Sequence, residues 1–488
     1  MASKIRLRYS GLIMFTSRIL SIITGLIFTI LITRNLTPQT FGVWQNVGDW
    51  LGYFTVVATV LPSWSLRYVA RGVKGSAETG LAFNLLVGGL LTVVYGLASG
   101  FMGGLVGVSP LIFALASVQV LELYLVPAFE AVANALRPEL IAYGQMLREV
   151  VKVGLAYLLV MTLDLGIFGA ILTVTAVYFV DIVFLASRFP WALKCRLNWG
   201  LLKEWFKGSL LTLYDLGVGR LWTLDMLMLA LLVGVEARAL YGAAYLVAGL
   251  VSYAVSLSVG LYPRLLTGGG AGDVETAFKA TLMFAVPMTV GVIVYAEPYL
   301  TVLNPVYVQG RVILTTLAVN FLLGCFTQIY KTTIYGLEKV DAEGNLTLTR
   351  LRRSSFFLLP TVGFTATVIY LPTLYYLLTR VVKTPPTAGV TVAVLTLLFQ
   401  AIWAAIFNRK TRKTINFKFP TKSLLKYFVA SILMAVVLLA SPKPTRILFL
   451  FAGTLLGAFT YFLTLALIDN ETRIVISKLL KACKLQIG

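Results

Sequence analysis

The chain has 488 residues, of which 58% are hydrophobic and only 12% are charged, and its formal net charge at pH 7 is +21. Soluble proteins carry about a quarter charged residues, so this composition leaves too little charge to coat the surfaces of soluble domains. The sequence contains no histidine, and its three cysteines form no CxxC pair. These absences exclude HExxH zinc sites and Ser-His-Asp triads and leave no cysteine-based metal site.

The apolar residues lie in blocks of about 20, the length needed to cross the hydrocarbon core of a bilayer as a helix. We therefore predict an all-α polytopic membrane protein with about fourteen transmembrane helices. The last two, near Tyr427–Ala440 and Ile447–Ile468, form an additional pair, and the first of them is short enough to be tilted or re-entrant. The preceding twelve are expected near Tyr9–Thr33, Val43–Leu66, Leu81–Val106, Pro110–Ala133, Tyr143–Leu163, Ile167–Ala186, Ser209–Val233, Leu240–Leu261, Phe278–Val302, Val312–Thr332, Phe356–Thr379 and Val390–Phe407.

Lysine and arginine are distributed unevenly over the connections between these spans. With the amino terminus inside, 32 basic residues fall on the inner side and seven on the outer side, while Arg18 and Arg220 lie within spans. The positive-inside rule then places both termini and the connection Phe189–Gly208 in the cytoplasm. The net positive charge then reflects basic cytoplasmic loops that face anionic membrane lipids. No nucleic-acid partner is expected.

Two similar segments occupy equivalent places in the two halves of the chain. Leu36–Trp44 joins the first span to the second, and Val235–Tyr245 joins the seventh to the eighth. Both units begin on the inner side, so the repeat is parallel, an arrangement that places substrate sites between the halves near the membrane midplane. The expected domains are an N-terminal six-helix bundle over 1–208, a C-terminal six-helix bundle over 209–420, and the additional helix pair with a basic cytoplasmic tail over 421–488.

The order and spacing of several short segments resemble the polysaccharide-transporter branch, with the O-antigen-type flippases, of the multidrug/oligosaccharidyl-lipid/polysaccharide flippase superfamily. One departure is Leu61–Ser65, a segment where the family usually carries a glycine at the end of the second span. The segments that carry the resemblance are Thr33–Trp44, Leu66–Arg71, Ala135–Arg137, Leu224–Leu229, Tyr241–Tyr245 and Leu261–Leu265.

The resemblance implies a flippase that moves a lipid-linked oligosaccharide on a polyprenyl phosphate or pyrophosphate carrier from the inner to the outer leaflet of a prokaryotic cytoplasmic membrane. The expected mechanism is alternating access by a monomer. Coupling to H⁺ or Na⁺ is one source of energy, and no cofactor is expected. A multidrug/cation antiporter of the same superfamily is the alternative, although such proteins typically have twelve spans. A membrane glycan polymerase or ligase is a third interpretation, but the short predicted outer loops and the lack of a GxxxxGK[ST] or DxD motif argue against an enzyme.

Ionisable residues within spans are costly and usually face a bundle interior or an aqueous path. Arg18 and Arg220 lie at similar depth in the first span of each half, about 12 and 17 Å from the inner ends of their helices. Two arginines facing one another would bind a phosphate, whereas each could instead be neutralised within its own bundle, for instance by Asp49 or Asp225. Asp215 and Asp225 are each five residues from Arg220, which places neither on the arginine's face of a continuous helix.

Polar residues on the second span and isolated acids complete the candidate site. Gln45, Asn46 and Asp49 share one face of a helix, and such a stripe either lines a cavity or serves helix packing. We assign Arg18, Arg220, Asp49 and Gln45 to substrate binding. The buried acids Glu122, Asp225 and Asp215 are candidates for ion coupling, and no catalytic, cofactor-binding or metal-binding residue is assigned.

Overall fold

The computed structural model describes residues 7–194, 196–266, 268–338, 354–382, 384–444, 446–469 and 473, with side chains from Leu20 onward apart from Ile22. Every regular element in this described part is helical, which confirms the predicted all-α class. Ten of its helices are long and apolar enough to cross a membrane, so the chain is a multi-pass membrane protein. Most of the basic tail expected at the end of the chain lies outside the described residues.

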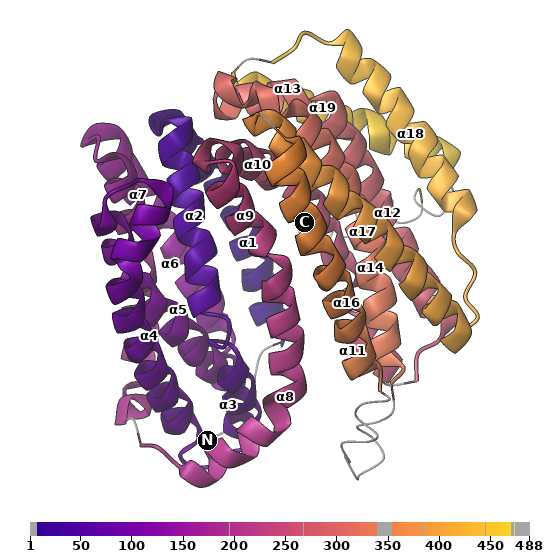
Figure 1. The fold of residues 1–488 in the computed structure, drawn as a ribbon. Coiled ribbons are helices and arrows are strands. Elements are labelled where there is room, and N and C mark those ends of the chain that lie inside the picture. The colour runs from indigo at the N-terminus through magenta and orange to yellow at the C-terminus, as the bar shows by residue number, and fades with distance from the viewer. Residues whose placement is uncertain are drawn as a thin grey trace, which may run out of the picture. The chain divides into compact units, whose positions relative to one another are not determined.

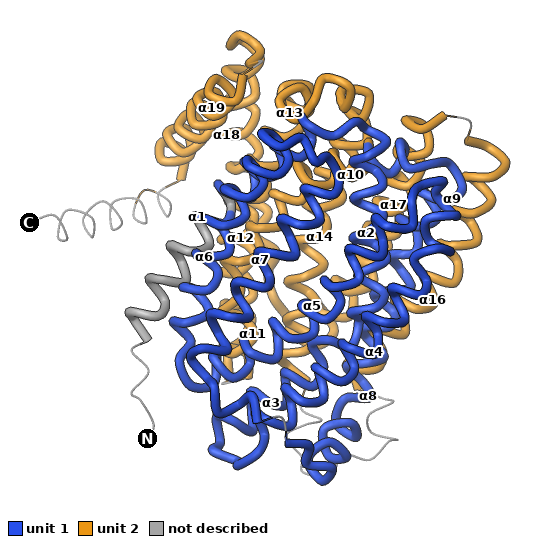
Figure 2. The backbone as a smooth tube through the Cα atoms, turned by 90° about the vertical axis from the view of Figure 1, so that its left-hand side faces the viewer, with its two compact units in different colours: residues 1–239 blue, residues 240–488 orange. Residues whose placement is uncertain are grey.

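The chain forms two compact units, residues 1–239 and 240–488 (Figure 2). The division falls inside α10 (Val235–Ala248), so one helix carries the chain from one unit to the next. The expected domain boundaries at residues 208 and 420 stay predictions, because compact units defined within the chain do not test where the two bundles of the repeat begin and end.

The first unit is a bundle built around α4, α5 and α7, with short or interrupted helices beside them (Figure 1). α4 packs along α5, α5 along α7, and α1 along α6. Its helices are α1 (Leu7–Asn35), α2 (Pro38–Phe54), α3 (Val60–Ala70), α4 (Ser76–Val106), α5 (Pro110–Leu136), α6 (Glu139–Ala156), α7 (Gly166–Arg188), α8 (Trp199–Trp222) and α9 (Leu224–Leu232), with a π-helix at Tyr157–Thr162 and a 3₁₀-helix at Pro190–Lys194.

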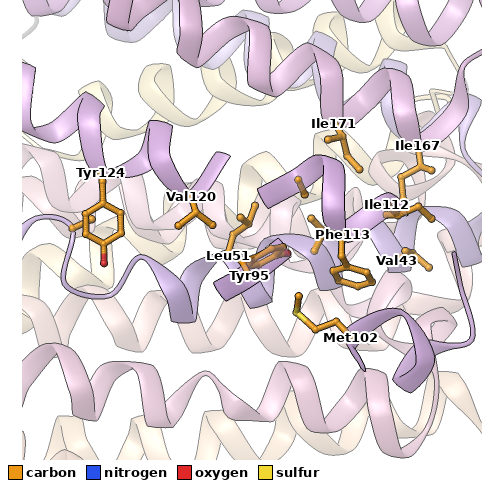
Figure 3. Packing of buried hydrophobic residues seen from close by; sticks show 13 residues of the cluster. Val43, Leu51, Tyr95, Met102, Ile112, Phe113, Val120, Tyr124, Ile167 and Ile171 are labelled. Carbon is orange, nitrogen blue, oxygen red and sulfur yellow. The ribbon is translucent and has the colours of Figure 1, made fainter. Parts of the chain in front are cut away.

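One core cluster of the first unit consists of aromatic and aliphatic side chains from α2, α4, α5 and α7 (Figure 3). Tyr95 and Phe113 are fully buried within it, and Leu51 of α2 packs against the same cluster. Because lipid tails are as apolar as these side chains, close packing rather than exclusion of water stabilises such an interior in a bilayer. The cluster therefore fixes the position of α2, which carries Gln45, Asp49 and Tyr53.

The second unit packs α14 along α17 and α12 along both α14 and α18, and α18 pairs with α19. Two of its spans contain 3₁₀ turns, at Gly249–Ser258 and Pro305–Gly310, and a π-helix covers Leu377–Val381. Its helices after α10 are α11 (Leu261–Leu266), α12 (Ala271–Val294), α13 (Ala296–Leu303), α14 (Arg311–Gly336), α16 (Ser355–Tyr376), α17 (Pro385–Thr414), α18 (Thr421–Ala440) and α19 (Ile447–Ile468).

The four expected spans that are not among the ten apolar helices are α1, α2 with α3, α6 with its π-helix, and α8 with α9. The second expected span, Val43–Leu66, is interrupted between Phe54 and Val60, and the seventh is interrupted at Thr223. Pro62 lies in the first turn of α3, where the backbone N–H that proline lacks would have no helical partner. In a continuous helix, however, the proline ring would clash with the carbonyl group four residues earlier. The proline therefore favours a break where the sequence suggested one continuous helix.

The helix expected at Tyr427–Ala440 is longer than the sequence indicated. α18 begins at Thr421 and is apolar enough over 20 residues to span a membrane. The first turns of α18 carry Lys422 and Lys426, and long basic side chains at a helix end extend toward the interface and are tolerated there. Its length supports a full transmembrane pair formed by α18 and α19.

Candidate functional site

Two interrupted helices of the first unit contribute a polar cluster. α2 packs against α9, and the phenol of Tyr53 at the end of α2 lies 3.2 Å from the hydroxyl of Thr223, the residue between α8 and α9. A break inside a membrane exposes backbone groups that must find partners within the protein. Here Asn84 of α4 donates to the carbonyl of Ala58 at 3.1 Å, and Tyr124 donates to that of Phe54 at 3.1 Å. The break between α2 and α3 is therefore stabilised by side chains from α4 and α5.

Asp49 on α2 forms a two-pronged ion pair with Arg238 in the first turn of α10. The guanidinium donates from Nε to Oδ2 at 2.7 Å and from Nη2 to Oδ1 at 2.8 Å, and Nη2 also approaches Gln45 Oε1 at 3.4 Å. The side chains are only 8% and 14% exposed. Gln45 and Asp49 are four residues apart and therefore share one helix face, as the sequence predicted. The pair neutralises both charges and joins α2 to the start of α10.

Arg220, near the end of α8, lies directly against the backbone of α2. A Cβ atom at Gly52 would be 2.8 Å from Nη1 of Arg220, so only glycine leaves the observed space for the guanidinium. Arg220 is half-buried, and no carboxylate in the described part of the chain forms an ion pair with it. A guanidinium held in place without a carboxylate partner can bind an anion such as phosphate.

Tyr53 lies among the charged residues of this cluster. The charges of Asp225, Asp49 and Arg220 all act on its phenol. Asp225 is 2% exposed and lies in the first turn of α9, where the positive end of the helix dipole favours a carboxylate. Asp215 lies farther back on α8 and is half-buried. The structure thus brings Arg220, Asp49, Gln45 and Asp225 into one neighbourhood of the first unit.

A second charged cluster joins α5, α6 and α7. Arg148 of α6 forms ion pairs with Asp181 of α7 at 3.1 Å and with Glu130 of α5 at 3.2 Å, and Asp181 is 1% exposed. Next to Arg148, Glu149 accepts a hydrogen bond from Thr24 of α1 and pairs with Lys152. These contacts tie four helices of the bundle together.

Glu122 lies on α5 and forms no ion pair with the residues of either cluster in the described part of the chain. It is 4% exposed, and its Oε2 atom has no hydrogen-bond partner among the described residues. Tyr178 of α7 is close enough for the charge of Glu122 to act on it. A buried carboxyl without a fixed partner is the kind of group whose ionisation state can respond to an ion or to a neighbouring conformational change.

The remaining assigned residue, Arg18, lies on α1, and its side chain is outside the described part of the structure. Its proposed approach to Arg220 therefore stays a prediction. Arg238 was missed because the sequence assigned it to an outer connection. Only Val233 and Gly234 separate α9 from α10, so Arg238 lies inside a helix and is 6% exposed. Within the described residues, no group of three or more acidic or cysteine side chains could hold a metal ion.

Comparison with solved structures finds the same fold in several membrane transporters. A structure described as lipid II flippase MurJ in an inward closed conformation covers 96% of this chain and 99% of its own, with a TM-score of 0.67 and 14% identity. An inward-facing multidrug resistance MATE family transporter of the MOP superfamily covers 80% and 94%, with a TM-score of 0.59 and 14% identity. A MOP superfamily transporter from Pyrococcus furiosus covers 84% and 95%, with a TM-score of 0.53 and 13% identity.

No protein-family model matches the sequence, and no curated protein matches it. At these identities the structural likeness establishes the fold alone, and both the MurJ flippase and the MATE transporters share that fold. The narrower resemblance to the O-antigen-type branch stays a prediction.

Proposed function

We propose that this chain flips a lipid-linked oligosaccharide, carried on a polyprenyl phosphate or pyrophosphate, from the inner to the outer leaflet of a cytoplasmic membrane. The observation that carries the proposal is the state of the two arginines next to α2. Arg238 is neutralised by Asp49, whereas Arg220 has no ion-pair partner in the described part of the chain and lies against Gly52. Arg220 is therefore the cation we assign to the phosphate of the substrate.

The physical task of a flippase is to move a sugar headgroup through hydrocarbon. Each hydroxyl buried without a hydrogen bond costs a few kcal/mol, so an oligosaccharide does not cross unaided at a useful rate. A polar path between helices removes much of this cost while the polyprenyl tail stays in lipid. The polar groups at the interrupted ends of α2 and α8, including Tyr53 and Thr223, offer hydrogen bonds along such a path.

We assign distinct roles to the residues around Arg220. Arg18 is the second arginine proposed to hold the phosphate, since it occupies the equivalent span of the repeat. Gln45 and Asp49 contribute to substrate binding by fixing Arg238 and the register of α2. Glu122, Asp225 and Asp215 are the acids proposed to couple transport to a gradient of H⁺ or Na⁺.

The comparisons favour a flippase over the two alternatives. The MurJ structure covers 96% of this chain, whereas the MATE transporter covers 80%. This difference fits a chain that has an additional helix pair which a twelve-span antiporter lacks. These structural neighbours are transporters, which also counts against a glycan polymerase or ligase.

The proposal is tested by reconstituting the full chain in liposomes that contain a fluorescent polyprenyl-diphosphate oligosaccharide in the inner leaflet. Charge-assisted hydrogen bonds contribute about 1.5–3 kcal/mol each, so Arg220→Ala should slow flipping roughly ten- to a hundredfold. Arg220→Lys should restore flipping only in part, because lysine keeps the charge but loses the planar fork.

Lys207→Ala is the matched control, since Lys207 is an exposed cation on the same helix. It should flip the substrate at the parental rate. Normal insertion with unchanged flipping by Arg220→Ala would remove Arg220 from the substrate site. Export of a cationic drug in place of the lipid-linked substrate by the parental protein would favour the antiporter alternative.

A further inference from the structure

The second unit contains a basic pocket that the proposed transport function does not use. It has a volume of about 450 Å³ and lies between the start of α12, the segment that leads into α18, and the end of α19. This volume falls within the usual range of small-ligand sites, about 300–1,000 Å³. Its charged lining residues are Glu275, Lys279, Lys418, Lys422, Lys426 and Asp469.

The charges in this pocket are unbalanced. Lys426 donates to Asp469 at 2.8 Å, and the carboxylate is 8% exposed, so this pair is neutral and ties α18 to the end of α19. Of the other lining residues, Lys418 and Lys422 carry two positive charges against the single carboxylate of Glu275. Lys418 and Lys422 are exposed and form no ion pair within the described residues. Such a pocket favours an anion, and lysine is a common ligand of phosphate.

Two exposed leucines are the chain neighbours of two residues that line this pocket, Lys426 and Ile468. Leu425, on the first turns of α18, is 69% exposed, and Leu467, on the last turn of α19, is 72% exposed. Apolar side chains this exposed on membrane-spanning helices face acyl chains, so the lysines next to them lie at the depth of lipid headgroups. Hydroxyl groups of Thr421 and Ser423 also line the pocket and can donate to phosphate or glycerol oxygens.

We propose that this pocket binds the headgroup of an anionic phospholipid, with its phosphate at Lys418 and Lys422 and its acyl chains along the apolar faces of α18 and α19. A lipid is favoured over a soluble phosphate because the polar pocket and the acyl-chain surface adjoin each other. The inference is independent of the flipped substrate, since every lining residue belongs to the second unit.

The test is native mass spectrometry of the full chain with phosphatidylglycerol and with phosphatidylcholine. The parental protein should retain phosphatidylglycerol preferentially, and Lys418→Gln with Lys422→Gln should reduce its occupancy at least about tenfold, the effect of about 1.4 kcal/mol. Binding of phosphatidylcholine should not change. Lys418→Arg with Lys422→Arg should keep the preference, because the charge remains.

Arg409→Gln with Lys413→Gln provides the matched control. Both residues are exposed at the end of α17 and do not line the pocket, so this pair should bind phosphatidylglycerol within twofold of the parent. Equal losses in both double variants would show general attraction to a charged surface and overturn the site. A parental protein without lipid preference would also overturn it, whatever the folding of the variants. Displacement of phosphatidylglycerol by equimolar glycerol 1-phosphate would show a soluble-anion site instead.

Discussion

The ion pair between Asp49 and Arg238 offers a sharp test of the structure. Both side chains are largely buried, and two hydrogen bonds of 2.7 and 2.8 Å join them. Removing one member leaves the other as an uncompensated buried charge, at a cost of about 3–5 kcal/mol, whereas replacing both with apolar residues is often close to neutral. We therefore expect Asp49→Leu and Arg238→Met to destabilise the protein strongly when separate and much less when combined.

The magnitude can be followed as a shift in thermal stability. A change of 1 kcal/mol moves the melting temperature of a domain of 150–250 residues by about 2–4 °C, so each single variant should melt roughly 6–20 °C below the parent. The assay is the loss of monodisperse full-length protein in detergent, measured by fluorescence size-exclusion chromatography after heating. Glu139→Gln breaks the more exposed pair with Arg137, whose side chains are 52% and 20% exposed, and serves as the control. It should cost no more than about 1 kcal/mol.

Two outcomes would contradict this reasoning. A single variant as stable as the parent would mean that the pair is not buried in the working protein. A double variant whose loss equals the sum of the two single losses would mean that the residues do not interact. Transport by the double variant adds a separate result. If the double variant regains both stability and flipping, Asp49 acts through Arg238. If it regains stability but not flipping, the pair itself contacts the substrate.

Three further predictions concern the site and the topology. Gly52→Ala should displace the guanidinium of Arg220 and slow flipping with little loss of stability, whereas Gly48→Ala on the same helix, with open space at its Cβ, should have no effect on the flipping assay. Glu122→Gln keeps the shape of a buried side chain while removing its charge, so flipping should lose its dependence on an imposed ion gradient at unchanged protein abundance; a retained dependence would exclude the coupling role. In intact cells, an impermeant thiol reagent should reach a cysteine at Glu236 and miss one at Trp191, and the reverse labelling would invert the predicted topology.

Much of the fold could be predicted from the sequence because membrane insertion depends on local properties. A run of apolar residues long enough to cross hydrocarbon must satisfy its backbone internally, so it forms a helix almost regardless of its neighbours. The all-α class and the additional pair α18–α19 followed from such runs. The interruption near Ala58 did not follow from the sequence, because it is stabilised by Asn84 of another helix, which donates a hydrogen bond to the carbonyl of Ala58.

The candidate site divides in the same way. The sequence by itself determined that Arg220, Asp49 and Asp225 are costly residues within spans, because their chemistry and depth follow from chain position alone. Only the tertiary structure decided their partners. Asp49 meets Arg238 from a distant part of the chain, and Arg220 meets a glycine rather than a carboxylate.

The basic pocket of the second unit depends even more on tertiary structure. Glu275, Lys422 and Asp469 lie in three separate segments, and each alone is an ordinary charged residue at a helix end. Their charges add in one place only because α12, α18 and α19 pack side by side. The length of an apolar segment is a local property of the sequence and can be read from it directly. The pairing of buried charges depends instead on which helices pack together, and this is decided only by the tertiary structure.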